Sequence, residues 1–153
     1  MIPSKKIKRI KSDLVLSETQ SYGYKNLLHI DCGDKKIFWW VEFEKPQNYR
    51  FIKNNKTKNY KSIIVRFIEP FERKENYFDD LYELLREFLN TKKSFGTTIE
   101  VYDKENIVTS NYNFFNCLIS SIHLPGVNTE SKINFLIEIN MYFDNYRNVN
   151  FDF

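Results

Sequence analysis

Residues 133–143 read INFLIEINMYF, and apolar side chains occupy every second position of this stretch. Strict alternation over this length is typical of a long β-strand with one buried face, because successive side chains of a strand point to opposite sides of the sheet. The positions expected to face inward are Ile133, Phe135, Ile137, Ile139, Met141 and Phe143. We therefore predict a half-buried antiparallel strand over residues 131–144.

The clearest helical pattern lies earlier in the chain, at residues 76–91, which read NYFDDLYELLREFLNT. Apolar residues recur there with the 3.6-residue period of an α-helix. They are Phe78, Leu81, Tyr82, Leu85, Phe88 and Leu89. Asn76 is a suitable N-cap, and Asp79 and Asp80 lie in the first turn, where the helix dipole favours negative charge. This segment predicts one amphipathic helix that packs its apolar stripe on a sheet.

The remaining apolar stretches are short and bounded by Asn, Lys, Gly or Pro, as expected for strands. They span residues 13–17, 25–32, 35–44, 61–68, 97–103 and 108–123. The segment IFWWVEF at residues 37–43 carries apolar side chains on both faces, which predicts either a central strand or one covered by a neighbouring subunit. The predicted fold class is mostly β (α+β), an antiparallel β-barrel or sandwich with one helix packed on it.

The length of 153 residues fits a single domain over residues 1–153. Three polar segments fall outside its predicted core. We expect residues 1–12 to form a basic N-terminal arm, residues 45–60 an exposed loop and residues 145–153 a C-terminal tail. No run of 18 apolar residues occurs, so the sequence predicts no transmembrane helix.

The formal net charge of +3 conceals an uneven distribution of charge along the chain. Residues 1–61 hold 14 Lys and Arg against 6 Asp and Glu, whereas residues 62–153 hold 9 against 14. Unlike charges on two parts of one chain favour head-to-tail docking between copies. A basic part also favours contact with nucleic acid. Charge alone leaves both interpretations open.

The basic residues gather in two patches that are candidates for assembly or for contact with nucleic acid. They are Lys5, Lys6, Lys8, Arg9 and Lys11 in the first patch and Arg50, Lys53, Lys56, Lys58 and Lys61 in the second. The second patch is interleaved with Tyr49, Phe51 and Tyr60, and basic residues beside aromatic ones are typical of surfaces that bind single-stranded nucleic acid. The alternative is a solvated loop or a docking arm for an acidic neighbour.

Residues with catalytic or metal-binding potential are few and scattered. His29 and His123 have no partner at metal-ligand spacing, and Cys32 and Cys117 do not complete a ligand set. No phosphate-binding loop, HExxH, calcium-loop or nucleophile-elbow pattern occurs. We therefore expect no enzyme activity, no metal and no cofactor, and we expect both cysteines to be buried thiols.

The order of elements in the last ~90 residues resembles the tail tube proteins of contractile-tailed, T-even-like bacteriophages, in which a strand, an acidic helix and three further strands follow one another. Three segments carry the resemblance: YKSIIVRFIEPFERKENYFDDLYELLREFL (60–89), GTTIEVYDKENIVTSNYNFF (96–115) and FFNCLISSIHLPGVNTESKINFLIEINMYFDNY (114–146). The second contains a turn at residues 103–106, and the third ends in an alternating aromatic strand.

The resemblance implies a structural virion protein whose copies, with other tail proteins, form hexameric rings, with their strands joined into one barrel through which DNA passes. It implies a location in the virion tail, after synthesis in the host cytoplasm, and no contact with a membrane. A junction protein between baseplate and tube, or a tube cap, fits the same pattern as the main tube subunit. The alternative function is a β-rich nucleic-acid-binding module that uses residues 49–61.

Overall fold

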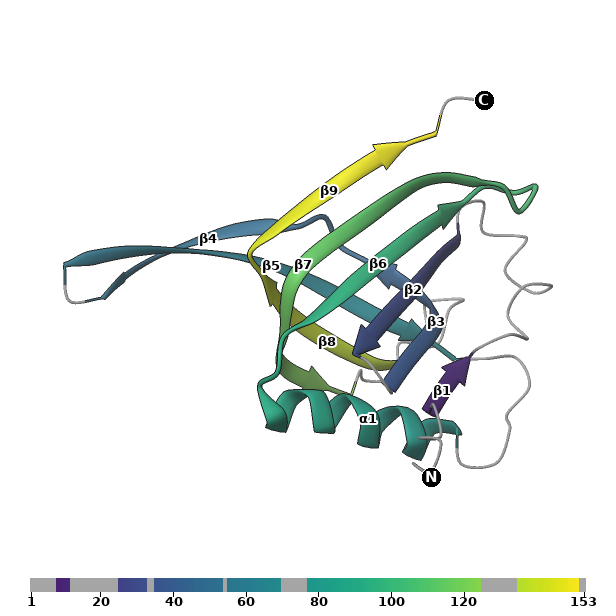
Figure 1. Ribbon diagram of the computed structural model, residues 1–153, viewed down its shortest axis with the longest axis horizontal. Coiled ribbons are helices and arrows are strands. Elements are labelled where there is room, and N and C mark those ends of the chain that lie inside the picture. Colours follow the sequence, from purple (N-terminus) through teal and green to yellow (C-terminus); the bar gives the residue numbers. More distant parts are fainter. Residues whose placement is uncertain are drawn as a thin grey trace, which may run out of the picture.

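The computed structural model describes residues 8–11, 25–32, 35–53, 55–69, 77–124 and 135–151. Its elements are shown in Figure 1. In chain order they are β1 (Lys8–Lys11), β2 (Lys25–Cys32), β3 (Lys35–Phe43), β4 (Gln47–Lys53), β5 (Lys56–Ile68), α1 (Tyr77–Thr91), β6 (Phe95–Tyr102), β7 (Val108–His123), β8 (Phe135–Phe143) and β9 (Asn145–Asn150). The predicted strand at 13–17, the Asn76 cap and Ile133 lie outside the described residues.

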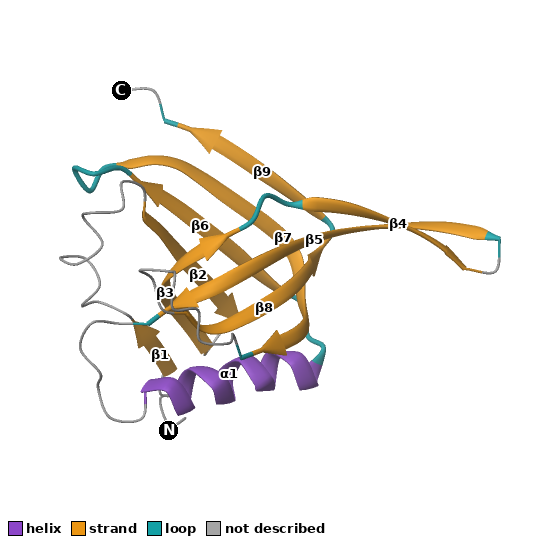
Figure 2. Ribbon diagram, turned by 180° about the vertical axis from the view of Figure 1, so that it is seen from behind, coloured by secondary structure: helices purple, strands orange, loops and turns teal. Residues whose placement is uncertain are grey.

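Six of the strands close into an antiparallel barrel in the order β3, β2, β6, β7, β8 and β5. Closure occurs where β5 pairs with β3, with Phe67 opposite Val41 and Val65 opposite Phe43. Closing a sheet on itself removes most of its exposed edges and encloses a core. Figure 2 shows the helix lying across one end of this barrel. The predicted fold class, mostly β with one packed helix, is confirmed.

The core fills the barrel with side chains from alternate strand positions. Ile137, Ile139 and Met141 of β8 are completely buried, as the alternation of that strand predicts. Trp39 of β3 is also buried and donates a hydrogen bond from Nε1 to the carbonyl oxygen of Ile68 at 2.8 Å. Trp40 points to the opposite face of β3 and is 4% exposed. The doubly apolar strand is therefore central in the sheet, with neighbours on both edges.

Helix α1 packs its apolar stripe on this core. Leu81, Leu85 and Phe88 are buried, and Phe88 contacts Phe95 of β6 with ring centroids 4.9 Å apart. Leu84 is also fully buried, which widens the stripe by one residue beyond the prediction. The helix ends before Lys92, which adopts a positive φ of 52°, a left-handed conformation common after a helix C-terminus.

The N-terminal arm predicted at residues 1–12 contains a strand. Strand β1 runs parallel to β3 and pairs with residues 35–38, while β5 pairs with residues 41–43 on the same strand. Strand β1 therefore extends the seam of the barrel where β5 does not reach. The short basic segment has few apolar residues to mark it as a strand, and it becomes one because β3 offers a partner.

The prediction of an exposed loop at residues 45–60 is wrong. Residues 47–53 form β4 and residues 56–60 extend β5, and the two pair as an antiparallel ribbon that leaves the barrel (Figure 1). We call residues 47–61 the basic ribbon. Asn55, at its tip, has a positive φ of 59°, which asparagine tolerates better than most residues. Because the ribbon is polar, apolar periodicity does not predict its strands.

The C-terminal tail predicted at residues 145–153 is also replaced, over most of its length, by a strand. Strand β9 pairs with residues 110–115 of β7, while β8 pairs with residues 118–123 of the same edge. The chain bends between the two at Asp144, whose amide donates a hydrogen bond to the carbonyl of Phe115 at 3.0 Å. The long strand β7 therefore pairs along the same edge with β9 over one part of its length and with β8 over the next.

Candidate assembly and binding surfaces

The predicted basic residues lie on two separate elements. Lys8, Arg9 and Lys11 belong to β1, and Lys5 and Lys6 lie outside the described residues. The second patch is divided between the paired strands of the ribbon, with Arg50 and Lys53 on β4 and Lys56, Lys58 and Lys61 on β5. Figures 1 and 2 place β1 beside the helix and the ribbon on the opposite side of the barrel. The two patches therefore form no single surface.

The register of the basic ribbon pairs its two strands residue by residue. Tyr49 pairs with Tyr60, Phe51 with Lys58 and Lys53 with Lys56. The ribbon therefore brings the basic and aromatic residues that the sequence predicts as a patch into one paired segment.

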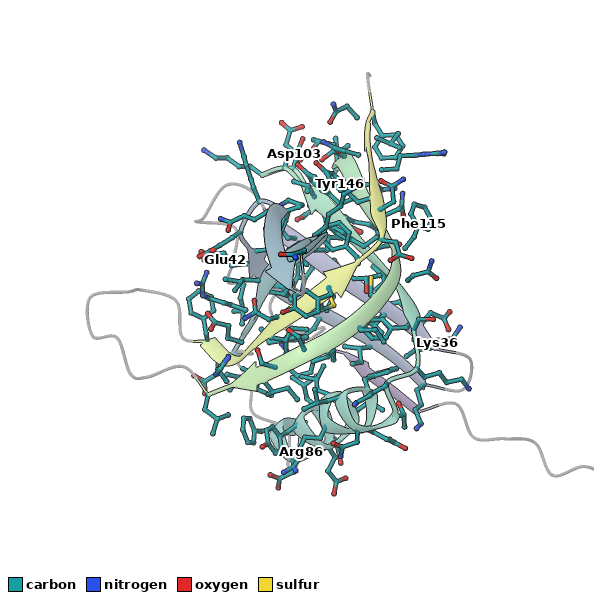
Figure 3. All side chains as sticks on the ribbon, turned by 90° about the vertical axis from the view of Figure 1, so that its left-hand side faces the viewer. Lys36, Glu42, Arg86, Asp103, Phe115 and Tyr146 are labelled. Atoms are coloured by element: carbon teal, nitrogen blue, oxygen red, sulfur yellow. The ribbon has the colours of Figure 1, made fainter. Side chains whose placement is uncertain are left out.

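A second surface lies on the outside of the barrel, across β7 and β8. Phe115, Leu118 and Tyr142 are 47%, 37% and 43% exposed, and Leu118 lies directly opposite Tyr142 in the strand pairing. Figure 3 shows Phe115 at the outer side of the sheet. Asn140 and Ser121, which are opposite each other, continue this face without charge. We call Phe115, Leu118 and Tyr142 the neutral patch.

The outer face of α1 is acidic and has no apolar side chain among its exposed positions. Asp79, Asp80, Glu83 and Glu87 are exposed there, and Glu87 pairs with Lys35 of β3. Arg86 lies over the ring of Tyr82, 5.7 Å from its centroid. Their exposure is that of a solvated helix face, on which charged residues are common.

Ion pairs beside the neutral patch are satisfied within the molecule. Arg66 donates from Nη2 to Glu44 at 2.9 Å and from Nε to Glu138 at 2.8 Å. The hydrogen bond to Glu44 raises the pKa of Arg66, and burial opposes that rise. This bridge joins β5 to β8 and to the segment after β3, so it stabilises the barrel wall and leaves the neutral patch uncharged.

The candidate chemical groups do not assemble into a site in the described part of the chain. His29 lies against Glu100 and packs edge-on against Phe38, and His123 contacts Ser121 at 3.1 Å on an exposed strand end. Burial raises the pKa of the Cys117 thiol to about 11, so it stays protonated at neutral pH. The described residues contain no cluster of His, Cys, Asp and Glu suited to a metal ion.

No helix within the described residues is both long and apolar enough to cross a membrane. The side chain of Cys32 lies outside the described set, so the burial predicted for it stays a prediction. Cys117 is buried as a free thiol, as predicted.

Solved structures of other proteins share this fold. The chain has the fold of Hcp1 from Salmonella typhimurium, with a TM-score of 0.52 and 10% identity over 85% of this chain and 87% of that one. Hcp1 from the E. coli EAEC 042 pathovar superimposes with a TM-score of 0.52 and 8% identity over 83% and 99%. A chain of the sheath–tube complex of an extracellular contractile injection system gives a TM-score of 0.47 with 15% identity over 88% and 97%.

No protein-family description and no curated protein matches the sequence. The likeness is therefore one of fold: a tail-tube-like barrel with one helix, shared with the Hcp1 structures at low sequence identity. The sequence did not predict the neutral patch, although the alternation of residues 133–143 placed Tyr142 on the face opposite the core. A signal was available in the aromatic residue itself, because an exposed Tyr on an otherwise amphipathic strand is typical of an interface.

Proposed function

We propose that this chain is a structural subunit of the tube in a bacteriophage tail or a related contractile injection machine, and that it is not an enzyme. The observation that carries the proposal is the closed six-stranded barrel with its single helix, because this fold is shared with the Hcp1 structures. The order of elements in residues 60–146, which resembles the phage tail tube proteins, supports the same function.

Surfaces suited to association between copies accompany this fold. All six residues of β9 are exposed, and among the described residues its only strand partner is β7. An exposed strand edge tends to pair with another chain unless something covers it. The neutral patch adjoins this edge, since Leu118 and Tyr142 lie where β7 passes from β8 to β9. A second copy that covers both would bury apolar surface and complete the sheet.

In the proposed assembly the copies form rings, six in number by the resemblance, which stack with other tail proteins in the virion. The lumen of such a tube would pass DNA, and the subunit needs no cofactor and no membrane. A baseplate-junction protein or a tube cap has the same requirements for a ring and is the alternative position within the tail.

Negative-stain microscopy and sedimentation of the purified chain test the proposal. Wild-type protein at high concentration is expected to form rings or short tubes, and Leu118→Asp is expected to shift it to monomers by placing a charge in the patch. Leu124→Asp is the matched control, because Leu124 is 63% exposed but lies just beyond the far end of β7, after His123. A wild-type chain that remains monomeric at every concentration would overturn the proposal.

A further inference from the structure

The part of β7 that pairs with β9 has one face without charge. Phe114 pairs with Tyr146, and the next pairs on the same side are Tyr112 with Asn148 and Ser110 with Asn150. These residues share a side because strand residues alternate between faces, and it is the side on which the ring of Phe114 is buried. We call Ser110, Tyr112, Tyr146, Asn148 and Asn150 the amide-aromatic face. None of them is charged, although 28% of the chain is.

The two tyrosine rings of this face are supported from within the fold. Tyr146 stacks on Phe114 and on Tyr112, with ring centroids 5.7 Å and 6.4 Å apart and an interplanar angle of 27° in both cases. Tyr112 also packs edge-to-face with Phe43 of β3 at 5.3 Å. Tyr146 nevertheless remains 40% exposed. A ring that is already held by its neighbours loses little freedom when a ligand stacks on its open side.

The asparagines beside these rings are not used by the fold. Asn148 and Asn150 are exposed, and in the described part of the chain their side-chain amides make no hydrogen bond. They are two residues apart on one strand, so they repeat at about 7 Å on the same side. Each amide can donate two hydrogen bonds and also accept them. The hydroxyl of Ser110, opposite Asn150, adds a further donor and acceptor.

We propose that the amide-aromatic face binds a neutral oligosaccharide, as a function separate from assembly. A sugar ring offers an apolar C–H surface to an aromatic ring, and its hydroxyl groups match amides because both groups donate and accept. The face has no lysine or arginine, which disfavours nucleic acid, because the affinity for nucleic acid depends on contacts with phosphates. A neutral ligand with many hydroxyl groups fits all of these side chains together.

A second copy of the chain complements this face less well. Phe115 and Leu118 of the neutral patch would cover the rings but offer no side-chain hydrogen bond to the amides, and burying an amide without a partner is costly. The exposed carboxylates of α1 would lose their hydration against a face that has no cation. Tyr146 and Phe115 lie on opposite sides of the sheet (Figure 3), so assembly through the neutral patch leaves the amide-aromatic face open.

Isothermal titration calorimetry of the full chain with cellohexaose, maltohexaose and N-acetylchitohexaose tests the proposal. At least one of the three should bind, and its affinity should stay unchanged when salt is raised from about 0.1 M to about 1 M, because the ligand is neutral. Tyr146→Ala should weaken binding roughly 2- to 10-fold, the range for one aromatic contact, whereas Tyr146→Phe should bind as wild type does. Asn148→Ala with Asn150→Ala should weaken it roughly 2- to 10-fold for each lost hydrogen bond.

The matched control is Asn111→Ala with Asn113→Ala. These two asparagines belong to the same strand pair but lie on its other side, opposite Val149 and Arg147. The control removes the same chemical groups and should bind as wild type does. Circular dichroism melting of each variant shows whether the barrel is intact.

No binding of any of the three sugars to wild type would overturn the proposal. Equal losses in the two asparagine variants would also overturn it, because the effect would then not come from this face. Loss of self-association in Tyr146→Ala, with no sugar bound by wild type, would instead identify the face as a contact between copies. Failure of the ring proposal is recognised separately, since Leu118→Asp tests it without altering this face.

Discussion

Asn116 and Asp144 are hydrogen-bonded across the point where one edge of β7 passes from β8 to β9. The Asn116 amide donates to Oδ2 of Asp144 at 2.9 Å, and Asn116 adopts a positive φ of 53°. The bulge at Asn116 and the bend at Asp144 face each other, so both strands change direction together. This pair therefore fixes where β9 leaves the barrel wall.

Replacing Asn116 should loosen this junction by two separable effects. Asn116→Ala loses the hydrogen bond and puts alanine, which tolerates a left-handed backbone less well than asparagine, at a positive φ, so we expect a loss of roughly 1–3 kcal/mol in the free energy of unfolding. Asn116→Gly keeps the backbone conformation and loses only the bond, so it should cost less than the alanine variant. Urea unfolding measures both, and hydrogen exchange should speed up in β9. Equal free energies of unfolding for the wild type and both variants would refute the conclusion that this pair fixes where β9 leaves the barrel wall.

Leu85 reports on the contact between the helix and the barrel. It is completely buried in the core, and Leu85→Ala should cost about 2–5 kcal/mol, the usual range for truncating a buried leucine. Asp80→Ala, at an exposed position of the same helix, is the control and should change stability by less than about 0.5 kcal/mol. A loss below that level for Leu85→Ala would mean that this face of α1 does not pack on the sheet.

Alkaline pH should destabilise the barrel through two groups, the buried Cys117 and the half-buried Tyr102. Burial raises the pKa of Cys117 from 9.0 to about 11, and burial together with Glu100 raises the pKa of Tyr102 from 10.0 to about 12. Each neutral form is favoured in the folded state. The stability linked to each is therefore complete below its unfolded pKa and is lost as pH rises through its folded pKa.

We expect the urea midpoint to fall steadily above pH ~9, the region where the unfolded thiol ionises first. Cys117→Ala and Tyr102→Phe should each remove part of that fall, without altering its onset at the other group. Alkylation of Cys117 by iodoacetamide at pH 8 should be slow in the native protein and fast in urea. Rapid alkylation of the native protein would show that the thiol is accessible.

Salt should distinguish apolar association between copies from association through charge. Association through the neutral patch buries apolar surface and should persist when salt is raised from 0.1 M to 1 M, where the Debye length falls to about 3 Å. Sedimentation of one protein sample at both salt concentrations checks this expectation. Rings that dissolve in high salt would indicate charge-driven docking between copies instead.

Much of the fold follows from apolar periodicity. The bounds of Val108–His123 and Lys25–Cys32 agree with prediction, and α1 begins one residue later than expected. Many of the apolar side chains that mark these elements are also buried in the core, such as Leu28, Leu85 and Ile119. At those positions sequence periodicity and burial express the same physical requirement.

The elements that were missed are stabilised by pairing more than by burial. Strand β9 reads NYRNVN, with every residue exposed, and nothing but the free edge of β7 marks it as a strand. The basic ribbon contains Asn and Lys at most positions, which are poor strand formers. Its register, in which Lys53 pairs with Lys56 and Tyr49 with Tyr60, is one that no periodicity reveals.

The ribbon leaves the barrel beyond the pairs that join β3 to β5, and its base still meets the wall where Lys61 pairs with Phe143 of β8. Residue pairs at the tip, such as Lys53 with Lys56, can be removed while the pairs nearer the barrel keep their partners. Descendants of this protein can therefore shorten or lengthen the ribbon in steps of one pair while the barrel wall stays as it is.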